Sequence, residues 1–358
     1  MSMDDLTVRG RFGHLLQEIE LPLESIGAIL AAIDRSTDAI HRARAELAND
    51  DQLKEQGLDF IAFGSLARYE MTTSSDLDYL LVGKNGGDNE FAHRVALDSV
   101  EKLRQGMIDG VTLSEPGKSG LFGAIIDPDE ITQAIGLQAD TNHSLSRRIL
   151  FLEESVSLFN PSSHEALLGA ILGKYLELRK IGSTGVPRTL LNDILRYWRT
   201  IAVDYHAKSA LNTPYSLRYL KLLIPRKLCF VSSVAPLYLM SHCLGEVDEL
   251  AFLKESFSQP PIVRLGRLLS AISQARYSDS EQNKIIAREM FGILNKFIKN
   301  AGDASWREVV AVECGQEDPC SSDNFGQMRS LGKELHGHIG AIFTSEAMLP
   351  FTKEYMLS

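Results

Sequence analysis

The sequence predicts an α+β protein, in which a mixed sheet with flanking helices is followed by an all-α C-terminal domain. Two short apolar runs, residues 58–63 and 77–82, are each followed directly by a glycine, which is typical of buried strands bounded by turns. Beyond Leu145, apolar residues recur at helical spacing with few Gly or Pro interruptions. We therefore expect one mixed sheet within about the first 140 residues and helices after it.

The remaining elements follow in chain order. Apolar residues at helical spacing within residues 12–56, interrupted near Pro22, predict two helices before the sheet. The run 77–82 is too apolar for an exposed edge, so we expect it inside the sheet. Residues 90–105 predict a helix, and residues 109–126 predict a third strand with a hairpin. The expected domains are N-terminal helices over 1–56, a central α+β domain over 57–140 and a helical domain over 141–358.

Composition excludes several classes of protein. The 358 residues carry a net charge of −10, with 44% hydrophobic and 23% charged residues, which excludes a disordered chain and a disulfide scaffold. The acidity disfavours a nonspecific nucleic-acid coat, although it leaves room for a local basic patch. No apolar run approaches the roughly 20 residues that span a bilayer, and the N-terminus lacks a signal-peptide core. We expect a cytoplasmic protein with no membrane partner.

The most informative segment covers residues 63–82. It combines a strand, a Gly64-Ser65 turn into a short helix, and a second strand that begins with Asp76 and Asp78. Because side chains alternate along a strand, the two aspartates project from one face. Converging carboxylates are costly without a cation, which predicts a bound Mg²⁺ or Mn²⁺. The glycine lets a phosphate approach the backbone, and the N–H groups at the start of the helix can bind it.

With Gly-Ser, a spacer of roughly ten residues and Asp-x-Asp, this segment resembles the nucleotidyltransferase superfamily of the DNA polymerase β type. The form Gly-Ser-x-Ala-Arg-x-Glu with Ser-Asp-x-Asp is most similar to the PII uridylyltransferase and glutamine synthetase adenylyltransferase branch and its uncharacterised relatives. The clear resemblance covers residues 58–83. It implies the nucleotidyltransferase fold, with Asp76 and Asp78 as catalytic residues that hold the metal. We expect nucleotide contacts from Gly64, Ser65, Arg68 and Ser75.

Two assignments stay open. Arg68 and Glu70 could contact phosphate and brace the motif, or they could form a surface ion pair. Members of the superfamily usually add a third carboxylate from a neighbouring strand, which acts as base toward the attacking hydroxyl. Glu115 and Asp109 are equally good candidates for this catalytic role, because both would project from the same face of a strand. Asp127 is a weaker candidate. If none of the three reaches the site, catalysis would be impaired or the domain would be a pseudoenzyme.

A basic stretch interrupts the acidic chain. Residues 174–227 hold eleven Lys or Arg against three acids, a local charge of +8 in a chain of −10. An anionic partner, most simply the triphosphate of a nucleotide, explains this asymmetry. On the helix expected over 189–208, Asn192, Arg196 and Arg199 recur on one face at spacings of four and three residues. This face could bind phosphate or ribose, or it could be a solvated face with local ion pairs.

These observations predict a metal-dependent nucleotidyltransferase that transfers a nucleoside monophosphate from ATP or another NTP to an acceptor hydroxyl and releases pyrophosphate. The acceptor could be a protein, an RNA end or a small molecule, with nucleic acid not favoured. One alternative is a synthase of nucleotide second messengers, although such enzymes lack the Ala-Arg-x-Glu spacer. Another is a catalytically silent regulatory module that retains nucleotide affinity. RNA tailing would require a longer basic surface.

Overall fold

The computed structural model describes residues 7–83, 94, 98, 99, 101, 103, 121–133, 135, 136, 138, 140–179, 185–209, 216–242, 248–313 and 323–357. The chain folds into two compact units, each made of segments that are discontinuous in sequence. Unit 1 comprises Met1–Ala31, Thr184–Gly245 and Pro261–Ser358, and unit 2 comprises Ala32–Ser183 and Glu246–Pro260. The predicted domain limits at residues 57 and 141 follow the linear sequence and stay a prediction.

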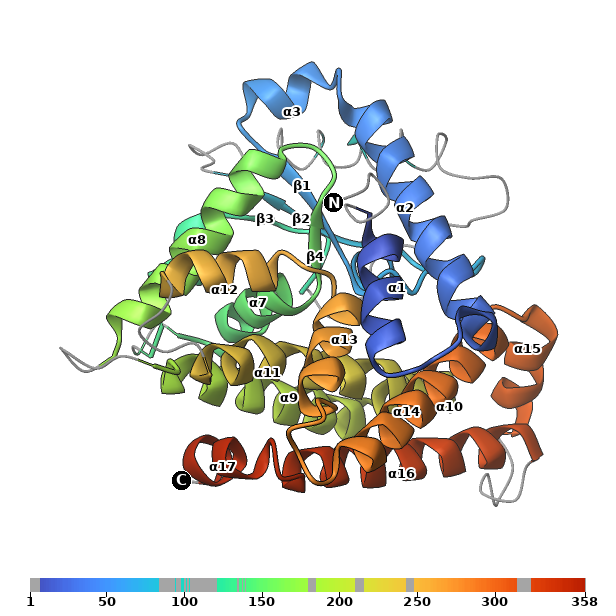
Figure 1. Cartoon of the computed structure of the whole chain (residues 1–358). Coiled ribbons are helices and arrows are strands. Elements are labelled where there is room, and N and C mark those ends of the chain that lie inside the picture. Colours follow the sequence, from blue (N-terminus) through green and yellow to red (C-terminus); the bar gives the residue numbers. More distant parts are fainter. Residues whose placement is uncertain are drawn as a thin grey trace. The chain divides into compact units, whose positions relative to one another are not determined.

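Unit 2 contains the sheet. Its strands are β1 (Asp59–Phe63), β2 (Asp78–Val82), β3 (Ile125–Ile126) and β4 (Ser155–Ser157). They lie side by side in the order β3-β2-β1-β4 (Figure 1), with β1 antiparallel to both β2 and β4, and β3 parallel to β2. Its helices are most of α2 (Gly27–Leu47), α3 (Asp51–Glu55), α4 (Gly64–Ala67), α6 (Pro128–Thr132), α7 (Asn142–Glu153), α8 (Pro161–Glu177) and α12 (Glu249–Phe257). This mixed sheet with flanking helices confirms the predicted α+β class.

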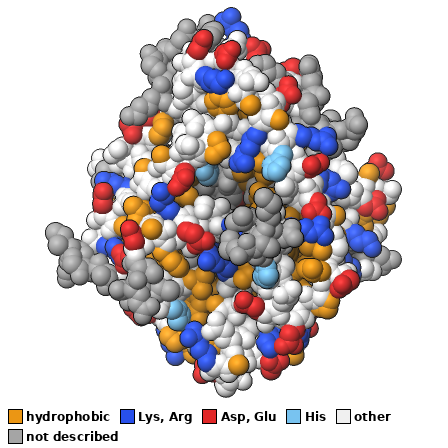
Figure 2. Space-filling model, turned by 45° about the horizontal axis from the view of Figure 1, so that its top comes forward, with side chains coloured by type: hydrophobic (Ala, Val, Ile, Leu, Met, Phe, Trp, Pro, Cys, Tyr) orange, Lys and Arg blue, Asp and Glu red, His pale blue; other side chains and the backbone are white. Residues whose placement is uncertain are grey.

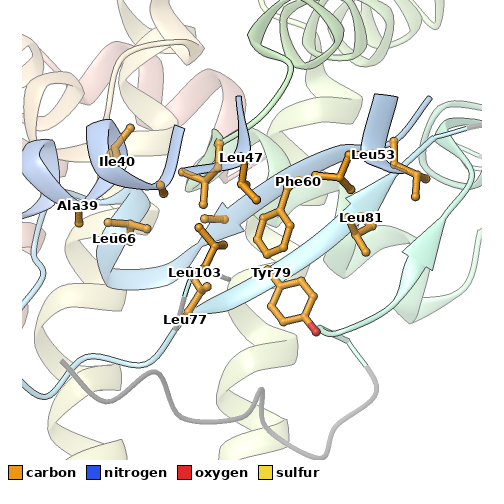
Figure 3. Packing of buried hydrophobic residues seen from close by; sticks show 14 of the residues in the cluster. Ala39, Ile40, Leu47, Leu53, Phe60, Leu66, Leu77, Tyr79, Leu81 and Leu103 are labelled. Carbon is orange, nitrogen blue, oxygen red and sulfur yellow. The ribbon is translucent and has the colours of Figure 1, made fainter. Parts of the chain in front are cut away.

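The two inner strands are covered on both faces, which explains why their sequences are almost continuously apolar. On one face, Phe60 and Tyr79 stack with ring centroids 4.9 Å apart. They belong to a buried cluster with Ala39 and Ile40 of α2 and Leu53 of α3 (Figure 3). Helix α8 packs against β1 and β4. The expectation that residues 77–82 lie inside the sheet is confirmed, because β2 lies between β1 and β3.

Three predicted segments need comment. One strand was not predicted: Ser155–Ser157 form β4 within the region expected to be helical. Three residues are too few to show strand alternation in a sequence. Of the helix expected over 90–105, residues 94, 98, 99, 101 and 103 are described and helical. Of the strand and hairpin expected over 109–126, Ile125–Ile126 form β3, while residues 109–120 lie outside the described residues.

The described secondary-structure elements of unit 1 are all helices. Its elements are α1 (Val8–Glu18), η2 (Leu23–Ile26), α9 (Arg188–Ser209), α10 (Ser216–Lys221), η3 (Leu222–Arg226), α11 (Lys227–Ser241), α13 (Pro261–Ile272), α14 (Ser280–Ala301), α15 (Ala304–Glu313), α16 (Asp323–Thr344), α17 (Leu349–Phe351) and η4 (Thr352–Met356). Contrary to expectation, one stretch in the described chain, Ser216–Ser241, is long and apolar enough to cross a membrane. Its apolar window is 78% buried within the protein, as in a core helix.

A buried carboxyl at the start of β1 makes the stability of unit 2 depend on pH. Asp59 is 1% exposed, and its Oδ1 accepts hydrogen bonds from Ser157 Oγ and Asn160 N, both at 2.8 Å. Burial raises the pKa of Asp59 from 3.8 to about 6. Between these values the folded state retains a proton that the unfolded chain has lost. The free energy of unfolding therefore falls as pH rises through this window.

We expect Asp59→Asn to remove this dependence. A shift of about two pKa units corresponds to roughly 3 kcal/mol, which the wild type should lose relative to the variant between about pH 4 and pH 7. Urea unfolding of both proteins across this range measures the difference. Burial lowers the pKa of His164 to about 4, and this shift makes the free energy of unfolding rise with pH. Because His164 is present in both proteins, its contribution cancels in the comparison. Parallel curves for the two proteins would contradict the prediction.

Candidate functional site

The Gly-Ser turn and the second aspartate of the motif lie together in unit 2. Strand β1 ends at Phe63, which pairs with Asp78 at the start of β2. The next residue, Gly64, has φ +71°, a left-handed conformation that favours glycine. A Cβ on this glycine would lie 3.0 Å from Asp78 Oδ2, so the carboxylate lies on the side of Gly64 where a side chain would begin. The antiparallel pairing therefore brings the two ends of the motif into contact.

Asp78 lies on the sheet face opposite the apolar cluster, and Asp76 lies in the loop two residues before β2. Leu77 and Tyr79, which alternate with them, belong to that cluster (Figure 3). Asp76 is exposed and Asp78 is half-buried. The alternation is present from Leu77 to Tyr79, with Asp78 between them, while a shared face for Asp76 and Asp78 stays a prediction. Solvent or a ligand can reach both carboxylates without disturbing the core.

The two aspartates suit a magnesium site of the open kind. In the described part of the chain, no group of three or more His, Cys, Asp or Glu side chains is placed to hold a metal ion. Mg²⁺ commonly uses one or two protein carboxylates and takes its other ligands from water and substrate phosphates. An exposed carboxylate at Asp76 and a half-buried one at Asp78 fit that pattern. The donor set of Asp76 and Asp78 is therefore compatible with a metal that arrives with the nucleotide.

Helix α2 tethers the loop that leads to the aspartates, a feature that sequence reasoning missed. Ser36, fully buried, accepts a hydrogen bond from Met71 N at 3.2 Å, and Arg35 Nη1 donates to Met71 O at 3.1 Å. Within the loop, Thr72 N donates to Ser75 Oγ at 2.9 Å. Ser75 is buried in this turn, which matches a turn-forming role. Its nucleotide contact stays a prediction.

Arg68 and Glu70 form a buried ion pair, so the surface alternative is wrong. Arg68 Nε lies 2.7 Å from Glu70 Oε2, and Arg68 Nη1 lies 2.5 Å from Glu154 Oε2. All three side chains are at least nine-tenths buried. Sequence reasoning missed Glu154, which no motif marks. The arrangement favours bracing of the motif over direct contact between Arg68 and phosphate.

The sheet register reduces the number of candidates for the third carboxylate. Val82 pairs with Ile126 in the parallel β2-β3 ladder. Asp127 therefore lies beyond Val82, whereas Asp78 lies at the opposite end of β2. At about 3.3 Å per residue this separates the two by roughly 16 Å along the strands. Asp127 instead caps α6, where its side chain accepts from Asp129 N at 2.8 Å. Asp109 and Glu115 lie outside the described residues and stay candidates.

The predicted basic face lies on α9 in unit 1, whereas the motif lies in unit 2. Asn192, Arg196 and Arg199 are all exposed, as their shared spacing predicts. Arg196 Nη1 donates to Asp193 Oδ1 at 2.9 Å, so the local ion pair of the alternative interpretation is present. Contact of these three residues with a nucleotide stays a prediction.

The charge excess of residues 174–227 is partly neutralised by acids from outside the stretch. Arg179 pairs with Glu249 at 2.5 Å, and Arg188 pairs with Glu354 at 3.5 Å. Figure 2 shows Lys and Arg interspersed with Asp and Glu among the described side chains of the face that it presents. The local count of +8 therefore overstates the basic surface that this stretch offers.

A known protein family matches the part of the chain that contains the motif. Residues 11–109, just over a quarter of the chain, match the family model described as "Putative nucleotidyltransferase DUF294". No curated protein matches the chain. The matched segment contains both the Gly64-Ser65 turn and the Asp76-Leu77-Asp78 strand start, and it supports nucleotidyl transfer as the general activity. The resemblance to the nucleotidyltransferase superfamily, predicted from the motif, is thereby confirmed for residues 11–109.

Proposed function

We propose that this protein is a metal-dependent nucleotidyltransferase that transfers a nucleoside monophosphate from an NTP to an acceptor hydroxyl, with release of pyrophosphate. The observation that carries the proposal is the position of the Asp78 carboxylate beside the turn, with its Oδ2 3.0 Å from where a Cβ on Gly64 would lie. A phosphate-binding turn and a metal-binding carboxylate at this separation suit a metal-bound triphosphate.

Each residue of the motif has a distinct task in this proposal. Asp76 and Asp78 would hold Mg²⁺ or Mn²⁺ on the polar face of the sheet. When bound, the cation would neutralise charge on the attacking and leaving oxygens. Backbone N–H groups at Gly64 and Ser65 would bind the β and γ phosphates, since the first N–H groups of a helix have no acceptor within it. The base that accepts the proton of the acceptor hydroxyl would be Asp109 or Glu115.

The direct test is incubation of the whole chain with each α-labelled NTP and Mg²⁺, in a lysate of the source organism. Label should appear on an acceptor, with pyrophosphate released in equal amount. Asp78→Asn is the matched control, because it keeps the size of the side chain but loses its charge. Label in a free cyclic or linear dinucleotide would assign the protein to second-messenger synthesis. Tight NTP binding without turnover would favour the silent regulatory module.

The exposed face of α9 provides a separate test of nucleotide binding. We expect Arg196→Ala and Arg199→Ala each to weaken NTP binding, because a hydrogen bond to a charged group contributes roughly 1.5–3 kcal/mol. The dissociation constant should rise by about tenfold to a hundredfold, as measured by calorimetry. Arg199 is expected to show the larger effect, since Arg196 already pairs with Asp193.

Arg276→Ala serves as the control for a general loss of charge, because Arg276 is also exposed in unit 1 but lies outside the basic stretch 174–227. Affinity for Mg²⁺ alone should stay unchanged in all three variants. An unchanged NTP affinity in the Arg196 and Arg199 double variant would assign this face to solvent or to the acceptor.

A further inference from the structure

The turn that carries Gly64 is flanked by a second strand on the side away from Asp78. Phe63 pairs with Asp78 of β2 and, on its other edge, with Ser155 of β4. Glu154 directly precedes Ser155. Because antiparallel strands pair residue by residue, this register brings Glu154 beside Gly64. One side of the turn therefore meets the metal-binding carboxylate, and the other meets a glutamate 90 residues further along the chain.

Arg68 joins this glutamate to the helix that follows the turn. Its Nη1 lies 2.5 Å from Glu154 Oε2, and its Nε lies 2.7 Å from Glu70 Oε2. The side chains of Arg68 and Glu154 are only 8% and 3% exposed, so water screens their attraction weakly. The rigid guanidinium spans two carboxylates that come from different parts of the fold. The far end of α4 is thus joined to the edge strand of the sheet.

The backbone after α4 closes in a Schellman motif. Glu70 N donates to Ser65 O at 2.9 Å, and Tyr69 N donates to Leu66 O at 3.1 Å. This motif requires a left-handed residue, and here that residue is Tyr69, at φ 60°, rather than the usual glycine. A tyrosine in this region persists only where the surroundings determine the conformation. The ion pairs that Arg68 forms with Glu70 and Glu154 provide such surroundings.

Fold stability alone gives a weak reason for this cluster. Replacing a buried ion pair by apolar residues of similar size is often neutral or stabilising. Fixing the geometry of the adjoining Gly64-Ser65 turn is a better explanation, because reacting groups must be held closely for transfer.

We propose that Glu154 is a positioning residue for nucleotidyl transfer, which acts through Arg68 to hold the Gly64-Ser65 turn at its contact with Asp78. This inference rests on the proposed function of the motif. It adds a residue from outside the segment matched by the nucleotidyltransferase family model. Glu154 itself touches neither nucleotide nor metal in this assignment.

The test compares Glu154→Gln with Asp140→Asn in the full chain. Asp140 pairs with the buried Arg148 in the same unit, at 2.9 Å, and therefore controls for the loss of a buried charge pair away from the motif. With Glu154→Gln, amide hydrogen exchange of Tyr69 and Glu70 should accelerate by about tenfold or more, since their hydrogen bonds close the turn. The kcat for transfer should fall by about 10- to 100-fold. The dissociation constant for Mg·ATP should change by less than about threefold.

In Asp140→Asn, both the exchange of these two amides and the kcat per folded molecule should match the wild type. Should Glu154→Gln fail to fold, Arg68→Lys keeps the cation between the carboxylates but loses the guanidinium fork, and should shift both readouts in the same direction. Unchanged exchange at Tyr69 and Glu70, or faster exchange with unchanged kcat, would overturn the positioning role. A wild type that transfers no nucleotide would instead overturn the proposed function, and the positioning role with it.

Discussion

Replacing either aspartate of the motif should abolish nucleotidyl transfer while the fold persists. A bound cation contributes several kcal/mol of transition-state stabilisation, so Asp76→Ala and Asp78→Ala should each lower kcat by at least about 10³-fold. Neither side chain belongs to the apolar cluster. Removing one carboxylate also relieves repulsion from the other. The metal-free variants should therefore unfold at the wild-type temperature or slightly above it.

Radiolabel transfer from α-labelled NTP measures the first expectation, and thermal unfolding followed by circular dichroism measures the second. Asp129→Ala is the matched control, because Asp129 is an exposed acid of the same unit at the start of α6. It should transfer nucleotide at the wild-type rate. Near-normal turnover in either motif variant, or unfolding of either, would contradict the assignment of these residues to a metal.

Adding a single methyl group at Gly64 should have the next largest effect. Gly64→Ala forces an L residue into φ +71°, which costs roughly 1–2 kcal/mol. Its Cβ would also lie 3.0 Å from Asp78 Oδ2, so the carboxylate must shift by a few tenths of an ångström. Small displacements of reacting groups can lower rates by about 10²-fold. We expect a loss of that order in kcat, together with a lower unfolding temperature.

Gly136→Ala separates the two causes. Gly136 has nearly the same conformation, φ +73°, but no described atom lies within 4 Å of the position of its Cβ. This variant should lose a similar amount of stability and keep its transfer rate. Equal losses of rate in both variants would show that backbone strain, rather than crowding of Asp78, explains the Gly64 result.

Part of the site follows from local periodicity alone. Alternation predicted that Asp78 lies on the face opposite its neighbours Leu77 and Tyr79, and both of these neighbours belong to the apolar cluster. The apolar runs predicted β1 and β2, because a strand covered on both faces needs apolar residues at nearly every position. The spacing of Asn192, Arg196 and Arg199 predicted one exposed face of α9 in the same way. Each of these conclusions depends only on residues within a few positions of one another.

The sequence alone therefore determined the α+β class, the two inner strands and the position of Asp78 on the face opposite the apolar cluster. Only the tertiary structure decided what surrounds them. Glu154 reaches Arg68 across 86 residues, and Ser36 reaches Met71 across 35. The sequence left Asp127 as a candidate for the site, whereas strand pairing places it beyond the end of β2 that is opposite to Asp78. Contacts between such distant residues depend on strand order and burial, and these leave no periodic signal in a single sequence.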